Sequence, residues 1–345
     1  MTARLGAVIF GIGVFAVVLG AGCAFYVTPA VARLPYDLTM CTATVTEDCL
    51  RASVAEAPGA QFLQTKGGAA PSVEIRTGTL RSTTEISPQH AQTAAEMTGD
   101  AVIWHVYSTV SWVETNEMVS QSITGVALDR DTAAAADWPN QFFEDAGKDR
   151  PSDIDFEGQL YKFPFGTQRQ DYQYFDSNLR RALPITFQDT ERIDGLETYR
   201  FQQTIPETTL TVSTDQLTAL LNRFTPGATA GRITYTNTRT LWVEPASGLF
   251  VKVQEQQRKT LVPSTGTPIA LLDATFTSTP ETLRNSISSA TDARNQLLLI
   301  SRYLPIGAAV IGAILMVLGP WLARRRKRPL RDSHLCRRKA SVLSG

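Results

Sequence analysis

LGAVIFGIGVFAVVLGAGCAFYV, the stretch from Leu5 to Val27, has 23 residues and no charged side chain. A helix needs about 20 apolar residues to cross the hydrocarbon core of a membrane. A second uncharged apolar stretch runs from Leu304 to Ala323. Buried core helices are the alternative interpretation, but each stretch is long enough to span and lies near a chain end. The sequence therefore predicts transmembrane helices at residues 5–27 and 303–323.

Basic residues are gathered on one side of the second stretch. Nine follow Trp321, five of them in Arg324–Arg328, and only Asp332 opposes them. Lys and Arg that flank a membrane helix stay cytoplasmic, so the C-terminus is expected inside. Two spans then place the N-terminus inside as well. We predict a two-pass plasma-membrane protein with a cytoplasmic N-terminus (1–4), an extracytoplasmic domain (28–302) and a basic cytoplasmic tail (324–345).

The first apolar stretch also has features of a signal peptide, since a charged start precedes an apolar run with small residues. Gly22-Cys23 resembles a lipoprotein cleavage site. However, Gly20 stands where such sites require Leu, Val or Ile, and the run continues to Val27. We favour an uncleaved anchor over a cleaved leader.

Cys41 and Cys49 are the cysteines of the predicted outer domain. An even pair in an oxidising compartment predicts a local disulfide between them. Two free thiols are the alternative, and metal ligation is disfavoured because no histidine is near in the sequence.

The formal charge of the whole chain is zero, with 33 basic and 33 acidic residues, but the two ends hold ten of the basic ones. The segment between them keeps 23 basic and 32 acidic residues, a net charge of −9. Phosphate backbones bind basic surfaces, so nucleic acid is excluded as a partner of this domain.

A period of two along the outer segment predicts β-strands. Val102, Trp104 and Val106 alternate with His105 and Tyr107, which places the first three on one strand face. Other segments of strand character are Val73–Ile86, Ser120–Leu128, Gln159–Phe165, Pro184–Gln188, Glu197–Ile205, Arg232–Val243, Leu249–Arg258 and Ile269–Thr277. Asp194-Gly195 and Pro245–Gly248 each predict a hairpin.

Helical spacing is found in Gln170–Ala182, Thr214–Asn222 and Glu281–Ser301. Thr279 or Ser278 is expected to cap the last of these. The segments Ala57–Ala70 and Thr260–Pro268 are rich in Gly, Pro, Ser and Thr and are expected to be linkers. The predicted fold class is α+β and membrane-anchored: a mostly antiparallel β domain, a sheet or barrel-like, with a few helices, between terminal transmembrane helices. Most of the strands carry charges too densely to cross a membrane themselves.

Local sequence patterns of known catalytic and metal sites do not occur, although a Ser-His-Asp site, whose members need not be sequence neighbours, stays an alternative. The histidines His90, His105 and His334 have no Cys/His metal spacing, and neither a G-x-S-x-G elbow nor a P-loop is present. We predict no enzyme activity, no catalytic, cofactor-binding or metal-binding residues, and no cofactor. His105 is expected to be a surface residue or a cross-strand partner.

Two clusters allow more than one interpretation. Four carboxylates, at Asp149, Asp153, Asp155 and Glu157, could serve as paired acids or bind calcium, but their spacing is not that of an EF-hand and a solvated loop is favoured. A group of aromatic residues is favoured as core, with a lipid- or sugar-binding surface as the alternative. Its members are Tyr161, Phe163, Phe165, Tyr172, Tyr174 and Phe175.

Several blocks of the sequence are distinctive. They are GQLYKFPFGT (Gly158–Thr167), YQYFD (Tyr172–Asp176), IDGLETYRF (Ile193–Phe201), and TRTLWVEP (Thr238–Pro245) followed by Ser247-Gly248, with FYVTP (Phe25–Pro29) and Leu34-Pro35 near the start. In this order they resemble the actinobacterial porin A family over nearly the whole chain. The Cys41–Cys49 segment lies outside the resembling blocks.

The resemblance implies two helices flanking an extracytoplasmic β-rich domain, in bacteria with a mycolic-acid envelope. The use of 26 Arg against 7 Lys fits a GC-rich genome. The resemblance assigns no catalytic residues.

Three functions follow as hypotheses. The first is a non-enzymatic envelope protein that binds or passes lipid or lipoglycan in envelope assembly, because some members of the resembled family are associated with lipomannan and lipoarabinomannan maturation. An apolar tunnel in the outer domain would favour it. The alternatives are a pore-forming porin-type protein after oligomerisation and an accessory subunit of a membrane glycosyltransferase. The expected partners are membrane lipid or lipoglycan, envelope-assembly proteins or further copies of the chain.

Overall fold

The computed structural model describes residues 2–41, 50–66, 72–97, 99–145 and 154–325. The chain divides into two compact units, Met1–Ala30 with Leu298–Gly345, and Val31–Leu297. The first unit is helical and the second is rich in strands, and each is described by itself.

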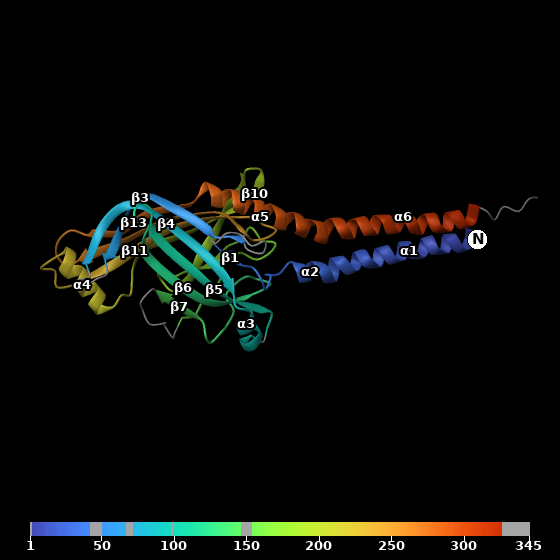
Figure 1. Ribbon diagram of the computed structural model, residues 1–345. Helices are drawn as coiled ribbons and strands as arrows, with labels where there is room; N and C mark the ends of the chain where they lie inside the picture. The colour runs from blue at the N-terminus through green and yellow to red at the C-terminus, as the bar shows by residue number, and fades with distance from the viewer. Residues whose placement is uncertain (1, 42–49, 67–71, 98, 146–153, 326–345) are drawn as a thin grey trace, which may run out of the picture. The chain divides into compact units, whose positions relative to one another are not determined.

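The helical unit is a pair of apolar helices that lie side by side (Figure 1). The first runs through α1 (Thr2–Gly22), the π-helical turn η1 (Cys23–Val27) and α2 (Thr28–Val31). The second consists of η2 (Leu299–Tyr303), also π-helical, and α6 (Leu304–Arg325). Both are long and apolar enough to cross a membrane, as the sequence predicts.

Glycines seven residues apart bring these two helices into close contact. Gly6, Gly13 and Gly20 of α1 face α6, and Gly312 and Gly319 of α6 face α1. A Cβ at Gly13 would lie 2.7 Å from the carbonyl oxygen of Gly312, and one at Gly319 would lie 2.7 Å from that of Gly6. Two backbones approach this closely only where side chains are missing, which is how helices pack in membranes.

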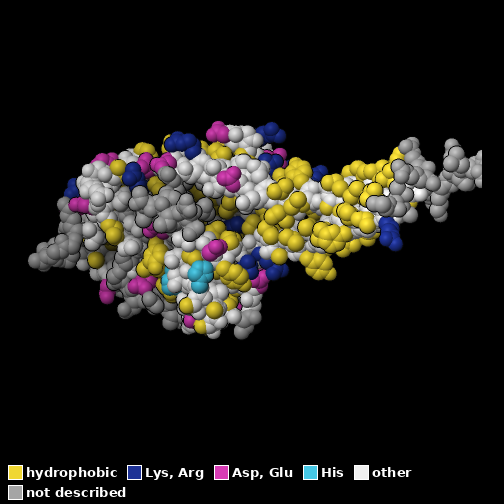
Figure 2. All heavy atoms as spheres, turned by 45° about the vertical axis from the view of Figure 1, so that its right-hand side comes forward, with side chains coloured by type: hydrophobic (Ala, Val, Ile, Leu, Met, Phe, Trp, Pro, Cys, Tyr) yellow, Lys and Arg dark blue, Asp and Glu magenta, His cyan; other side chains and the backbone are white. Residues whose placement is uncertain are grey.

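The outward faces of the same helices are apolar. Phe15, Val18 and Val317 have exposed fractions of 63%, 62% and 71%. Hydrophobic side chains cover the visible surface of the pair almost continuously in Figure 2. Such a surface is stable only against lipid or against another apolar surface.

The second unit is built on one curved antiparallel sheet, a half-barrel in form (Figure 1). Within the described residues, eleven strands follow one another in the order β7-β6-β5-β4-β3-β13-β12-β11-β10-β9-β8. They are β3 (Ser53–Lys66), β4 (Ser72–Pro88), β5 (Ala101–Trp112), β6 (Glu117–Asp129), β7 (Phe142–Asp145), β8 (Tyr172–Asp176), β9 (Arg181–Ile193), β10 (Leu196–Thr209), β11 (Gly231–Val243), β12 (Phe250–Pro263) and β13 (Ile269–Ser278). The short β1 (Met40–Cys41) and β2 (Leu50–Arg51) lie off this path.

Both predicted hairpins are confirmed. Asp194 and Gly195 have φ angles of 47° and 85° and connect β9 to β10. Positive φ at both central residues of a two-residue turn suits the twist of the flanking strands, and Asp-Gly tolerates it. The turn between β11 and β12 ends at Gly248, whose φ is 71°.

Backbone hydrogen bonds from the segments around Ala134 and Gln159 connect β6, next to one end of the sheet, to β8 at the other end. Asp129 N donates to Ala134 O (2.9 Å), and Ala135 N donates to Gly158 O (2.8 Å). Gln159 N then donates to Gln173 O (2.7 Å), and Phe175 N to Gln159 O (2.9 Å). This path links β6 to β8 without a complete strand between them.

Three helices pack on the sheet. The helix α4 (Thr214–Phe224) packs Leu220 and Leu221 on the inward Ile233 and Leu261. The helix α5 (Pro280–Leu298) packs Ala290 on Val251. A bulge between Phe250 and Lys252 turns Val251 to the face of β12 opposite to Val253. The helix α3 (His90–Glu96) is tied to β5, because Ile103 N donates to Thr93 Oγ1 (2.9 Å).

The predictions for α4 and α5 are confirmed. Thr279 caps α5, because its Oγ1 accepts from Thr282 N at 3.1 Å. The predicted helix at Gln170–Ala182 is wrong. It contains β8, a turn, and the start of β9. Asp176 Oδ1 accepts from Asn178 N and Leu179 N, both at 3.0 Å, and these bonds stabilise the turn instead of a helix.

Three further predictions are corrected. Ala57–Ala70 is not a linker, because its described part belongs to β3, where Pro58 and Gly59 sit at a bulge. Thr260–Pro268 is partly strand, since β12 continues to Pro263. Gln159–Phe165 forms no named strand; its isolated bridges at Gln159 are part of the connection from β6 to β8 instead.

The predicted Cys41–Cys49 disulfide includes Cys49, which lies outside the described residues, so the bond stays a prediction. The same holds for the Asp149 and Asp153 part of the acidic cluster.

Candidate functional site

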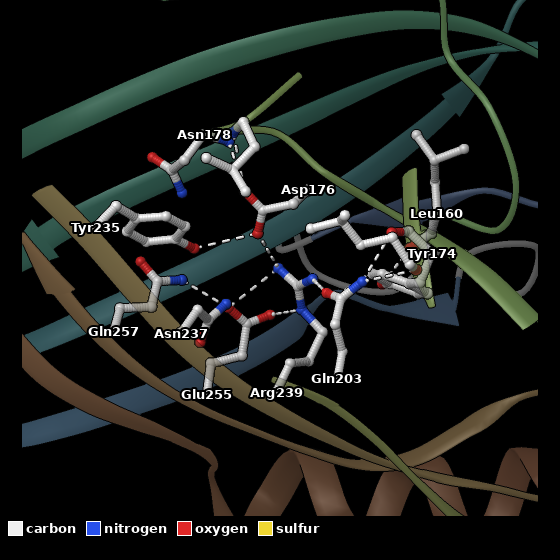
Figure 3. Close-up of polar contacts among 12 residues, drawn as sticks. Leu160, Tyr174, Asp176, Asn178, Gln203, Tyr235, Asn237, Arg239, Glu255 and Gln257 are labelled. Atoms are coloured by element: carbon white, nitrogen blue, oxygen red, sulfur yellow. Dashed lines mark hydrogen bonds and ion pairs between the residues drawn. The ribbon is translucent and has the colours of Figure 1, made fainter. Parts of the chain in front are cut away.

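Polar residues occupy the middle of the inward face of the sheet. Along β11 the inward positions are Ile233, Tyr235, Asn237, Arg239 and Leu241, so apolar residues flank a polar centre. The strand register brings partners from the neighbouring strands: Glu255 of β12 and Gln203 of β10 both lie opposite Arg239. The result is a buried network around one guanidinium group, drawn in Figure 3.

Arg239 has two carboxylate partners. Its Nε lies 2.5 Å from Glu255 Oε1, and its Nη2 lies 3.4 Å from Asp176 Oδ2. Its Nη1 donates to Gln203 Oε1 at 2.5 Å. The exposed fractions of the Arg239, Asp176 and Glu255 side chains are 7%, 0% and 18%. A charged group is retained in such a place only when it is paired and hydrogen-bonded.

Asp176 joins the end of β8 to this network. Besides the two turn amides and Arg239, its carboxylate accepts from Tyr235 Oη at 3.1 Å (Figure 3). The carboxylate of Glu255 has two further hydrogen bonds. Its Oε2 accepts from the amide nitrogens of Gln257 and Asn237, at 2.6 and 3.4 Å. Four strands, β8, β10, β11 and β12, are thus connected through side chains as well as through the backbone.

The electrostatics favour a permanent ion pair. Burial lowers the pKa of Arg239, but the attraction of Glu255 and Asp176 outweighs it and leaves the pKa above its usual range. Burial raises the pKa of Glu255, but the charge and hydrogen bond of Arg239 bring it below its ordinary value. Burial also raises the pKa values of Tyr174 and Tyr235. These shifts oppose proton transfer near neutral pH and indicate a structural role.

A second buried cluster joins two of the blocks that resemble the porin A family, Gly158–Thr167 and Thr238–Gly248. Phe163 N donates to Gly248 O and Gly166 N to Ala246 O, both at 3.0 Å. A Cβ at Gly248 would lie 2.1 Å from Phe163 O, so this contact requires glycine. The two blocks therefore form one packed corner.

Lys162 is buried in this corner. Its Nζ donates to Phe163 O at 3.0 Å and lies 3.6 Å from the centroid of the Phe165 ring. Burial lowers the pKa of Lys162 to about 7, although the nearby Glu244 carboxylate raises it. Glu244 itself accepts from Ser247 N (2.7 Å) and Ser247 Oγ (2.6 Å) within the β11–β12 turn.

The aromatic group singled out in the sequence is mainly core, as favoured. Phe163, Tyr174 and Phe175 are buried, and the ring of Phe163 stacks on that of Phe201 with centroids 4.8 Å apart. His105 packs its ring edge-on against Phe142 across the neighbouring strand, with centroids 5.4 Å apart. This contact confirms a cross-strand partner.

The remaining acidic candidates, Asp155 and Glu157, are exposed, and Asp155 Oδ1 accepts from Gln141 Nε2 at 3.4 Å. Among the described residues, no group of three His, Cys, Asp or Glu side chains is placed to hold a metal ion.

Sequence reasoning missed the network and the buried lysine. One signal was present: Arg239 alternates with Leu241 and Val243, which places a charge on an apolar strand face. Its partners could not be named, because they depend on the register between strands.

A model of the family described as Porin PorA matches residues 5–321. A protein named Porin PorA from Corynebacterium amycolatum is 27% identical over an alignment of 172 residues that covers 41% of this chain and 45% of that protein. Another with the same name, from Corynebacterium resistens, is 44% identical over 48 residues, 14% of this chain and 12% of that protein. The chain thus spans less than half the length of these relatives.

These names support a porin-type envelope protein in a membrane. They give no support to the expectation of lipid or lipoglycan binding, and the porin alternative fits them better. Since the family model covers nearly the whole sequence and the structure has the two terminal helices and the β-rich unit that the resemblance implies, the chain belongs to the Porin PorA family.

Proposed function

We propose that this protein is a non-enzymatic porin-type protein of the bacterial plasma membrane, and that several copies together form a pore. The observation that carries the proposal is the match to the Porin PorA family over residues 5–321. The geometry of the two units supports one of them over the other as the part that forms the passage.

The helical unit is the part suited to the membrane. One helix pair encloses no channel, because its two backbones are in contact along the glycines of α1 and α6. Its outward side chains, such as Val18 and Val317, are apolar and exposed. Further copies of the chain are therefore the partners that a pore requires.

The strands are poorly suited to form the wall. Their outward faces carry exposed ion pairs between neighbouring strands, including Glu56 with Arg81 and Arg258 with Asp273. Charged side chains facing lipid at the middle of a bilayer cost about 2–4 kcal/mol each for Arg and Lys. The basic run Arg324–Arg328 favours a cytoplasmic C-terminus. With two membrane helices, the N-terminus is then cytoplasmic too, and the β-rich unit lies on the extracytoplasmic side.

The test is ion conductance. Full-length protein purified in detergent is added to planar bilayers of phosphatidylcholine and phosphatidylglycerol, and discrete conductance steps are expected. Denatured protein and detergent alone serve as controls. The current should rise faster than linearly with protein concentration, because one copy is insufficient. Silent bilayers into which fluorescently labelled protein has inserted would contradict the proposal.

A further inference from the structure

The sheet splits between β9 and β10. Their pairing begins at the hairpin turn and ends at Thr186 opposite Gln202. From there β9 continues toward Arg181 paired with β8, whereas β10 continues to Thr209 paired with β11. Two strand segments that are neighbours in the sheet order thus separate.

A groove of about 390 Å³ lies at this split and is lined by residues of both strands. Cavities of this size accept small organic molecules. Leu183 and Pro184 of β9 and Ile205 and Pro206 of β10 supply apolar walls. Proline has no backbone N–H, so the two prolines also make the groove a poor place for an added β-strand.

Arg181 is the charged residue among the described residues that line the groove. Asp176, its cross-strand neighbour, is buried and already bonded to Tyr235 and Arg239. Within the part of the chain that the structure describes, no ion pair involves Arg181. An exposed guanidinium beside a groove with both apolar and polar walls is suited to a carboxylate or phosphate group.

The split is held open by a side chain. Gln203 Nε2 donates to Tyr174 O at 2.9 Å (Figure 3) and to Leu183 O at 3.1 Å, so the amide connects β10 to both β8 and β9. Its Oε1 accepts from the buried Arg239, which fixes the amide in place. The groove is therefore preformed, and a ligand loses little affinity to reorganisation of the protein.

We propose that the groove between β9 and β10 binds a small organic anion with an apolar body. The anionic group pairs with Arg181, and the body lies between the walls that contain Pro184 and Pro206. The inference is independent of pore formation, since it concerns the β-rich unit alone.

The test uses 4-fluorobenzoate as the probe and full-length protein in phosphatidylcholine nanodiscs. Binding is followed by fluorine NMR line broadening, with empty nanodiscs subtracted. A ligand of this size is expected to bind with a Kd on the order of 1 mM. The neutral analogue 4-fluorobenzyl alcohol should bind about tenfold more weakly, because it lacks the charge-assisted hydrogen bond.

Arg181→Gln should weaken binding of the benzoate about tenfold and leave the alcohol unchanged. Arg192→Gln, at another exposed arginine of β9, is the matched control and should bind both like the wild type. Thr204→Phe, at an exposed position of the groove lining, should block both ligands. Equal binding of benzoate by the Arg181→Gln variant and the wild type, or absence of binding by the wild type, would overturn the proposal.

Discussion

At the scale of single residues, the buried Arg239 pairs with two carboxylates inside the sheet. Its guanidinium faces Glu255 and Asp176, and removing it leaves two carboxylates without their cation. The ion pair need not add net stability over an apolar core, but breaking it on one side is costly.

Arg239→Met is therefore expected to destabilise the β-rich unit by about 3–5 kcal/mol. The measurement is urea unfolding of the full-length protein followed by circular dichroism in the strand region. The double variant Arg239→Met with Glu255→Met also removes one of the two carboxylates and should therefore recover part of the loss, while Asp176 keeps its bond from Tyr235. A double variant no more stable than the single one would count against an uncompensated buried charge.

Lys162 predicts a dependence of stability on pH. Its pKa is lowered to about 7 in the folded protein, against about 10.4 in an unfolded chain. Below pH 7 the lysine is charged in both states and the burial penalty is complete. Between these two values the unfolded state binds more protons, so stability rises with pH.

The wild type should accordingly gain thermal stability from pH 6 to pH 9, and Lys162→Met should gain less. Scanning fluorimetry at the two pH values provides the comparison. Lys252→Met, on the neighbouring β12, controls for the general effect of losing a lysine. An identical pH response of the wild type and the Lys162→Met variant would show that the lysine is not the group responsible.

At the scale of elements, the sequence predicted those strands that have one apolar face and failed where turn chemistry competes. The alternation from Val102 to Val106 gave β5 directly, because one face packs in the core. Gln170–Ala182 appeared helical from its apolar spacing, but Asp176 binds the following amides and ends the strand instead. The composition of Ala57–Ala70 suggested a linker, since a bulged strand and a linker both use Pro and Gly.

The candidate groove shows why sites are harder to predict than elements. Its walls depend on where the pairing of β9 and β10 stops, and no pattern in either strand alone marks that point. The helical unit was easier, because length and absence of charge suffice to predict a membrane helix.

Gly13→Leu is expected to separate α1 from α6. A side chain at Gly13 would meet the backbone of Gly312 and Met316, at 2.7 and 2.9 Å from Cβ, and backbone cannot yield as a side chain can. Gly11→Leu is the matched control, because nothing lies within 4 Å of a Cβ there. Energy transfer between dyes at the positions of Thr2 and Ala323 should fall only in the Gly13→Leu variant. Equal transfer in both variants would refute glycine-mediated packing.

At the scale of the whole molecule, the segment between the apolar stretches and the C-terminal tail carry opposite net charges. The segment between the two apolar stretches has a net charge of −9, and the residues after Trp321 include nine basic ones. Cytoplasmic retention of the basic tail therefore predicts the direction in which the chain crosses the membrane.

This topology can be checked in intact cells with a membrane-impermeant maleimide. Gln256→Cys, at an exposed position on β12, should be labelled from outside, and Ser344→Cys should be labelled only after permeabilisation. Both variants are made with Cys23, Cys41, Cys49 and Cys336 replaced by Ser. The opposite labelling pattern would invert the proposed orientation.

The position of β3 beside β13 has a consequence for biosynthesis. The first and last long strands meet in the middle of the sheet, with Ala55 opposite Ser278. During translation, β3 cannot pair with β13 until the ribosome has passed residue 278. Joining them closes a loop of more than two hundred residues, which is a slow step with exposed strand edges. The β3 edge that will meet β13 is therefore unpaired, and open to wrong pairing, until almost the whole β-rich unit has been made.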